Sequence, residues 1–217
     1  MTEATAPTPA ADTPQPDTLP PDRQLQAFVQ RRVRDLARRY TTDTATGVAA
    51  VARLRRAVEH APGSDPAIWP DTLADLPPAL IGHTDRPSRY ERAAHSAITL
   101  FAVHQQSKNT SMHRDGAGLG RAVRRLSATD FSEEATLRRF QALATASSYP
   151  ETIHHLRGLI TQLRSAGVAL DYGMLARDLA RLQTPRTADS VRLSWGRDYH
   201  RRAADEQDTA GRPATTA

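Results

Sequence analysis

The chain contains 217 residues, enough for one domain or two small ones with a buried core. It contains no cysteine, which excludes disulfide scaffolds, thiolate zinc sites and cysteine nucleophiles and is typical of a reducing compartment, so we expect a cytoplasmic protein. No apolar run approaches the ~20 residues that span a bilayer. The first 21 residues lack the basic and apolar regions of a signal peptide, so we expect none.

The positive charge is concentrated in the middle of the chain. The formal net charge is +5, but residues 1–22 contain four acidic and no basic residues. Residues 23–203 contain 28 basic and 17 acidic residues, a net charge of +11, and residues 204–217 carry −2. All but one of the 29 basic residues are arginines, whose guanidinium groups match phosphate oxygens in pairs. This distribution favours a polyanionic partner.

The hydrophobic spacing predicts helices in nearly all of the middle region. Residues 1–22 and 204–217 are rich in Pro, Thr, Ala and acidic residues, so we expect disordered tails. Between them, apolar residues recur at the i, i+3, i+4 spacing of a helix, and no segment alternates with the period of a strand. The predicted helices cover about 22–40, 45–60, 87–106, 119–126, 132–146, 150–166 and 172–183, and the last begins at Thr187 or Asp189.

Local signals support several of these boundaries. Pro87 suits a first helical position, Ser132 and Asp171 are candidate N-caps, and Gly167 is a candidate C-terminal glycine. The proline-rich connection 61–86 has one short helical turn, and we expect Trp69 to pack it onto the core. The predicted fold is all-α, with about eight helices in two packed bundles that cover residues 23–128 and 129–203.

We find no sequence pattern for catalysis, a metal or a cofactor. The eight histidines form no H-E-x-x-H motif and no i, i+4 pair, and G-x-S-x-G is absent. The glycine-rich run 115–120 follows no predicted strand and precedes no Lys-Ser/Thr, so it does not fit a nucleotide-binding loop. Glu133 and Glu134 suit the first turn of a helix, where acids complement its dipole.

The arginine clusters carry the functional signal. Arg121, Arg124 and Arg125 share one face of a predicted helix, in a stretch from 116 to 129 without acidic residues. The predicted helix 22–40 contains six arginines and two aspartates. Aromatic residues are sparse and not interleaved with these clusters, so a base-stacking platform is not expected. We expect sequence-independent contacts with phosphates along a groove.

Several short motifs together resemble the CasB family, the small subunit of the type I-E CRISPR surveillance complex Cascade. The motifs are Leu119-Gly-Arg-Ala122, Arg138-Arg-Phe-Gln141, His155-Leu-Arg-Gly-Leu159, the run 170–179 (LDYGMLARDL), Leu54-Arg-Arg56 and Trp195-Gly-Arg-Asp-Tyr199. Their order and spacing cover about residues 45–200. Each motif is short, and it is the combination that carries the resemblance.

The resemblance implies an all-α protein that is not an enzyme and uses no cofactor or metal. It implies two copies packed head to tail beside the guide crRNA, the repeated backbone subunit and the large subunit, where they stabilise the R-loop by holding the target and displaced DNA strands. The nucleic-acid-binding residues that we expect are those in matching motifs (Arg55, Arg56, Arg121, Arg138, Arg139), those close to them (Arg124, Arg125, Lys108, Arg114) and those selected by charge alone (Arg31, Arg34, Arg38).

Two other interpretations stay open at this point. An independent helical DNA-binding regulator would need a recognition helix and usually a symmetric dimer. A purely structural subunit would use its arginines to contact acidic proteins. Binding of the isolated protein distinguishes the first alternative, because a regulator prefers one duplex site and a Cascade subunit binds any nucleic acid in a salt-sensitive way.

Overall fold

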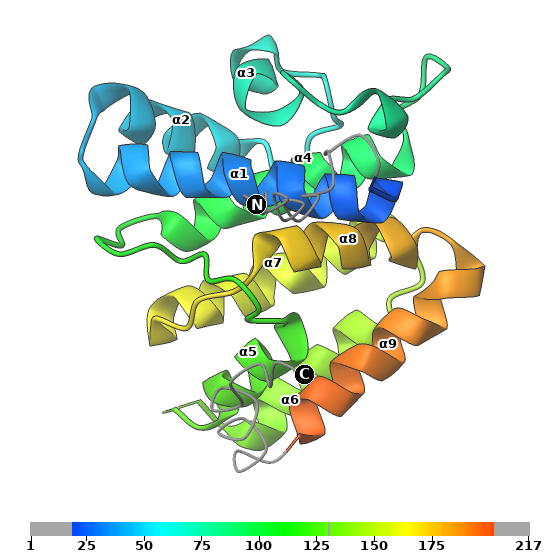
Figure 1. The fold of residues 1–217 in the computed structure, drawn as a ribbon. Coiled ribbons are helices and arrows are strands. Elements are labelled where there is room, and N and C mark those ends of the chain that lie inside the picture. Colours follow the sequence, from blue (N-terminus) through cyan, green and yellow to red (C-terminus); the bar gives the residue numbers. More distant parts are fainter. Residues whose placement is uncertain (1–18, 130, 202–217) are drawn as a thin grey trace, which may run out of the picture.

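The computed structural model describes residues 19–129 and 131–201, and within these ranges the fold is all-α, as predicted (Figure 1). Of the predicted disordered tails, residues 1–18 and 204–217 lie outside the described ranges. No helix in the described part is long and apolar enough to cross a membrane. The elements are α1 (Pro21–Thr41), α2 (Ala45–Arg56), η2 (Pro66–Ile68), α3 (Trp69–Thr72), η3 (Pro78–Leu80), α4 (Arg89–Gln105), α5 (Leu119–Ser127), α6 (Glu133–Ala144), α7 (Tyr149–Ala166), α8 (Tyr172–Leu182) and α9 (Pro185–His200).

The larger group of helices is built around α4. Helices α1 and α8 pack against each other and against α4, while α2 and α7 pack along two further sides of α4 (Figure 1). Every residue of α4 from Ala93 to Gln105 is buried, which explains its run of small and apolar residues. Phe101 meets Tyr172 of α8 edge to face, with ring centroids 5.2 Å apart.

The smaller group consists of α5, α6 and α9. Phe140 of α6 packs against Trp195 and Tyr199 of α9, with ring centroids 6.2 Å and 5.6 Å away. Helices α5 and α9 approach closely at Gly120, where a Cβ atom would lie 2.3 Å from the Trp195 carbonyl oxygen. This contact explains the glycine in the Leu119–Ala122 motif, because any side chain would push the two helices apart.

The two packed groups are interleaved in the sequence. Helix α8 joins α1 and α4 in the larger group, while α5 packs against α9 in the smaller one, so contacts cross the predicted boundary at residues 128 and 129. Whether residues 23–128 and 129–203 are independent folding units stays a prediction. At the N-terminal end, α1 begins at Pro21, so the last two residues of the predicted tail belong to the helix.

Several helix ends agree with the sequence signals. The side chains of Ser132 and Asp171 accept hydrogen bonds from the backbone N–H groups of Ala135 and Met174, as N-caps do. Gly167 ends α7 in the left-handed conformation, with φ of 68°.

Other expected boundaries were wrong. Helix α4 begins at Arg89 with a Ser88 capping box rather than at Pro87, and α9 begins at Pro185 because its ring suits the first turn. Trp69 does not pack onto the core: it is 45% exposed, and the neighbouring Ile68 is buried instead.

Candidate nucleic-acid interface

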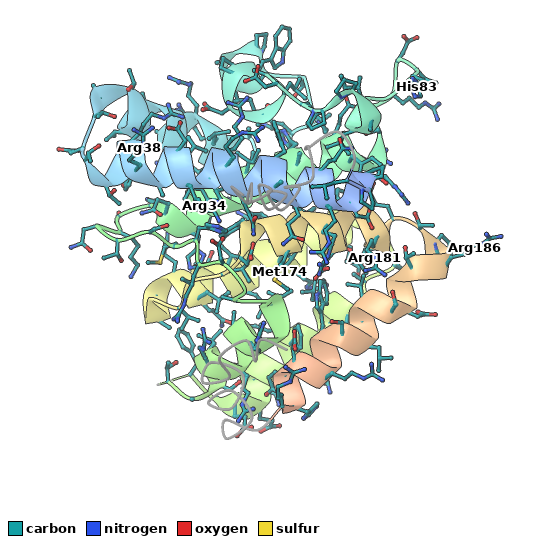
Figure 2. All side chains as sticks on the ribbon, in the orientation of Figure 1. Arg34, Arg38, His83, Met174, Arg181 and Arg186 are labelled. Atoms are coloured by element: carbon teal, nitrogen blue, oxygen red, sulfur yellow. The ribbon has the colours of Figure 1, made fainter. Side chains whose placement is uncertain are left out.

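The exposed arginines of α1 lie beside acidic partners. Arg34 and Arg38 lie on the C-terminal half of α1 (Figure 2). With His113 and Asp115 of the loop 106–118, they line a hollow of about 390 Å³. Arg34 forms an ion pair with Asp115, and Arg38 forms one with Asp35. Much of the local positive charge is therefore compensated.

Arg31 has a different environment, because its guanidinium lies 5.7 Å from the ring centroid of Phe28. On the loop, Arg114 is exposed and Lys108 is half-buried. The loop is fixed to both ends of the larger group: Ser107 N–H donates to the Tyr40 hydroxyl at 3.0 Å, and Arg114 N–H donates to the Leu170 carbonyl at 3.2 Å.

A cluster of two buried residues and one exposed residue anchors the loop. His113, Asp115 and Asp171 place ligand-type atoms within 4.8 Å of one another, a set that could hold a metal ion. Each group already has protein partners: His113 Nδ1 accepts the Tyr172 N–H, and Asp171 accepts the N–H groups of Gly116 and Met174. We therefore assign this cluster to loop anchoring.

The cluster also shifts two acid–base equilibria. Burial lowers the pKa of His113, so the ring stays neutral and can accept a hydrogen bond. Burial acts to raise the pKa of Asp115, but hydrogen bonding and charge attraction from Arg34, with a contribution from His113, lower it overall. Asp115 is therefore a stable anionic partner for Arg34.

The three arginines of α5 are half-buried rather than fully exposed. Arg121 donates to the Gly116 carbonyl, so its guanidinium fastens the loop to α5. Arg124 lines a hollow of about 420 Å³ with Glu133 and His200, among other residues. The predicted common face thus contains arginines in different environments.

The two adjacent arginines of α6 are both exposed. Arg138 pairs with Glu134 one helical turn earlier, a geometry that contributes little at the surface. Arg139 has no acidic partner among the described residues.

A groove along α4 brings together the largest group of arginines. Arg55 and Arg56 at the end of α2 face Arg157 and Arg164 of α7, and Val103 and Gln106 form the floor beside them in a hollow of about 490 Å³. Arg164 is held in place because it donates to the Gln106 side chain at 2.9 Å. We call the groove along α4, between α2 and α7, the central groove. The part that contains these four arginines is its basic half.

Acidic side chains compensate only part of the positive charge in the basic half. Arg55 and Arg56 have no acidic partner among the described residues, while Arg157 pairs with Glu59. Four guanidinium groups around one hollow can bind successive phosphates in the paired geometry that oxyanions favour.

The sequence prediction found half of this cluster. Arg55 and Arg56 were expected, whereas Arg157 and Arg164 were missed, although Arg157 lies within the quoted 155–159 motif. Their spacing of seven residues, two helical turns, was the available signal. The twelve expected residues do not share one hollow: Arg34 and Arg38 line one, Arg55 and Arg56 line a second, and Arg124 lines a third.

Comparisons with known proteins identify the family of the chain. Residues 50–200 match the family described as CRISPR-associated protein Cse2. The structure resembles CasB from Thermobifida fusca at 36% sequence identity, with a TM-score of 0.69, covering 82% of this chain and 98% of that one. It also resembles a chain of a CRISPR RNA-guided surveillance complex at 26% identity, with a TM-score of 0.64, covering 86% of this chain and 99% of that one.

CasB from Thermus thermophilus shows the same fold at 22% identity, with a TM-score of 0.58 and coverage of 84% and 99%. No curated protein matches the chain at a significant level. The family match covers more than half of the chain, and the resemblance to CasB that the short motifs indicated is confirmed. The chain belongs to the CRISPR-associated Cse2 family, which includes the CasB proteins.

Proposed function

We propose that this chain is the non-catalytic small subunit of a type I-E Cascade complex. In this role it contacts nucleic-acid backbones without reading their sequence. The observation that carries the proposal is the basic half of the central groove, where four arginines from α2 and α7 surround one hollow. The family membership supports the same role, since one similar chain comes from an RNA-guided surveillance complex.

The contacts would act on the R-loop. Exchange of a DNA duplex for an RNA–DNA duplex is nearly balanced in free energy, so a few contacts with phosphates can stabilise the product. The partners are then the guide crRNA, the target and displaced DNA strands, the repeated backbone subunit, the large subunit and a second copy of the chain. This assembly would act in the cytoplasm.

A role without chemistry fits the buried polar groups. His104 Nδ1 lies 2.8 Å from the Tyr172 hydroxyl, and Asp178 accepts the Trp195 indole N–H at 2.8 Å. These groups hold helices together, and His113 and Asp171 anchor the loop. Each has a structural task that explains its burial.

Reconstitution tests the proposal. The chain, the other Cascade subunits and a guide RNA are mixed, and the complex is isolated by size-exclusion chromatography. We expect the chain to co-elute, and we expect a complex without it to lose target DNA faster. A chain that stays outside the complex and binds one preferred duplex site as a dimer would contradict the proposal and support a regulator.

A further inference from the structure

A second hollow lies further along α4, on the other side of the Glu59–Arg157 ion pair from the basic half. This hollow of about 310 Å³ is lined mainly by Val58, Ala61, Pro62, Pro150 and Ile153. Its size is at the lower end of small-molecule pockets, about 300–1,000 Å³. We call it the apolar half of the central groove.

Helices α4 and α7 line both halves, and the third wall is the end of α2 in the basic half and the turn after α2 in the apolar half. Helix α2 and the turn after it supply Arg56 and then Val58, and α7 supplies Arg157 and then Ile153. A helix rises 1.5 Å per residue, so these α7 positions lie about 6 Å apart along its axis. The Glu59–Arg157 ion pair connects the two walls where the halves meet.

An unsatisfied buried nitrogen lies in the wall of the apolar half. His95 of α4 is only 2% exposed, and its Nε2 donates to the Ala57 carbonyl at 3.0 Å. Nδ1 is then the acceptor nitrogen, and it has no hydrogen-bond partner among the described residues. Burial lowers the pKa of His95, which keeps this nitrogen unprotonated. A buried acceptor without a donor is unfavourable, and because Nδ1 has less than 1 Å² of accessible surface, a ligand N–H would stabilise it only after a small shift of the side chains around it.

We propose that the central groove binds a nucleotide of single-stranded nucleic acid, with its phosphate among the four arginines and its base in the apolar half. This assignment rests on the proposed function and adds a base-binding site to it. Unstacked bases of single strands enter apolar slots, and their edges are read by hydrogen bonds. A base N–H would supply the donor that His95 Nδ1 lacks. Paired and stacked bases of a duplex cannot enter the slot.

The site differs from a base-stacking platform, which the sparse aromatic residues of the sequence made unexpected. A platform needs several exposed aromatic rings in a row. The apolar half is instead a single slot. Its aliphatic and proline side chains lie beside polar and aromatic ones, which are Glu59, His60, Arg92, His95, Ser96 and Tyr149, and its position near the arginines fixes which part of the nucleotide enters.

Two labelled strands of equal charge test the slot. The full chain is titrated into fluorescein-labelled dT12 and into a twelve-residue strand that consists entirely of abasic sites, and binding is followed by fluorescence anisotropy. We expect the wild type to bind dT12 about fivefold more tightly.

Ala61→Trp fills the exposed rim of the apolar half and should abolish the difference while affinity for the abasic strand stays within twofold. Ala67→Trp, at an exposed position on η2 outside the groove, is the matched control and should retain the difference.

Circular dichroism and melting temperature establish that both variants fold. Equal binding of the two strands by the wild type, or a difference that survives in Ala61→Trp, would overturn the base slot even when both strands bind in a salt-sensitive way. Equal binding combined with a failure of Ala61→Trp to enter the assembled complex would place a protein segment in the apolar half, and the nucleotide assignment would be wrong. A wild type that binds neither strand would contradict the proposed function as well.

Discussion

The central groove and the outer surface of α1 are both rich in arginine, yet their electrostatic environments differ. On α1, Arg34 and Arg38 are 54% and 74% exposed at the side chain, and both already pair with aspartates. In the groove, Arg55 and Arg56 have no acidic partner among the described residues, and two more arginines lie across from them. The availability of an arginine for phosphate therefore depends more on its neighbours than on its exposure.

The sharpest test of this comparison removes two arginines from each region. Arg55→Ala with Arg56→Ala should weaken binding of single-stranded DNA by at least about a hundredfold, because each of the two charge-assisted contacts contributes about 1.5–3 kcal/mol. Arg34→Ala with Arg38→Ala should weaken it less than tenfold, since Asp115 and Asp35 already compensate these charges. Anisotropy titrations at several salt concentrations provide the measurement.

The salt dependence gives a second readout from the same titrations. The groove variant should lower the slope of log affinity against log salt by about 1.4, which is about 0.7 per lost contact with a single strand. Equal losses of affinity in the two double variants would show that the ion pairs on α1 do not keep its arginines from binding phosphate.

Acid should lower the free energy of unfolding of the fold that carries both regions, because the buried His104 lies between them. Burial, together with smaller contributions from the charges of Lys108 and Arg164, lowers its pKa to about 3. The unfolded chain binds a proton near pH 6.5, so this stability is complete above that pH and falls as the pH drops towards 3. We expect a loss of about 2 kcal/mol at pH 5 relative to pH 7 from this group.

Urea unfolding at the two pH values measures this loss. His104→Gln keeps a polar partner for the Tyr172 hydroxyl and removes the titration, so the difference between pH 7 and pH 5 should shrink by about the same amount. An unchanged difference would mean that other groups cause the acid sensitivity.

A smaller effect concerns the acid at the junction of the two halves of the groove. Glu59 competes with phosphate for Arg157, so Glu59→Gln should tighten binding of single-stranded DNA about threefold. Glu134→Gln, which frees Arg138 on α6 outside the groove, is the matched control and should change affinity less than twofold. Weaker binding by Glu59→Gln would indicate that the ion pair positions Arg157 rather than masking it.

The sequence predicted most of the fold because local chemistry specifies it. The helices followed from the spacing of apolar residues, and Ser132, Asp171 and Gly167 marked helix ends correctly. The start of α9 was missed because Pro185 opens the helix earlier than the Thr187 and Asp189 signals suggested.

The candidate site was less predictable because it depends on contacts between distant segments. Arg34 and Asp115 are 81 residues apart, so their pairing cannot be inferred from either local sequence. The basic half likewise unites residues near positions 55, 105 and 160. Arg55 and Arg56 were found as a local cluster, whereas Arg157 and Arg164 stand singly in the sequence and acquire meaning only when α7 packs beside α2 along α4.

The lifetime of target DNA on the assembled complex tests the central claim most directly. Complexes are prepared with wild-type subunit, with Arg55→Ala and Arg56→Ala, or with Arg34→Ala and Arg38→Ala, and the dissociation of labelled target DNA is followed after a chase. We expect all three to assemble and the groove variant to release target DNA more than tenfold faster than the other two. Equal lifetimes in the three complexes would contradict a role of the central groove in holding nucleic acid.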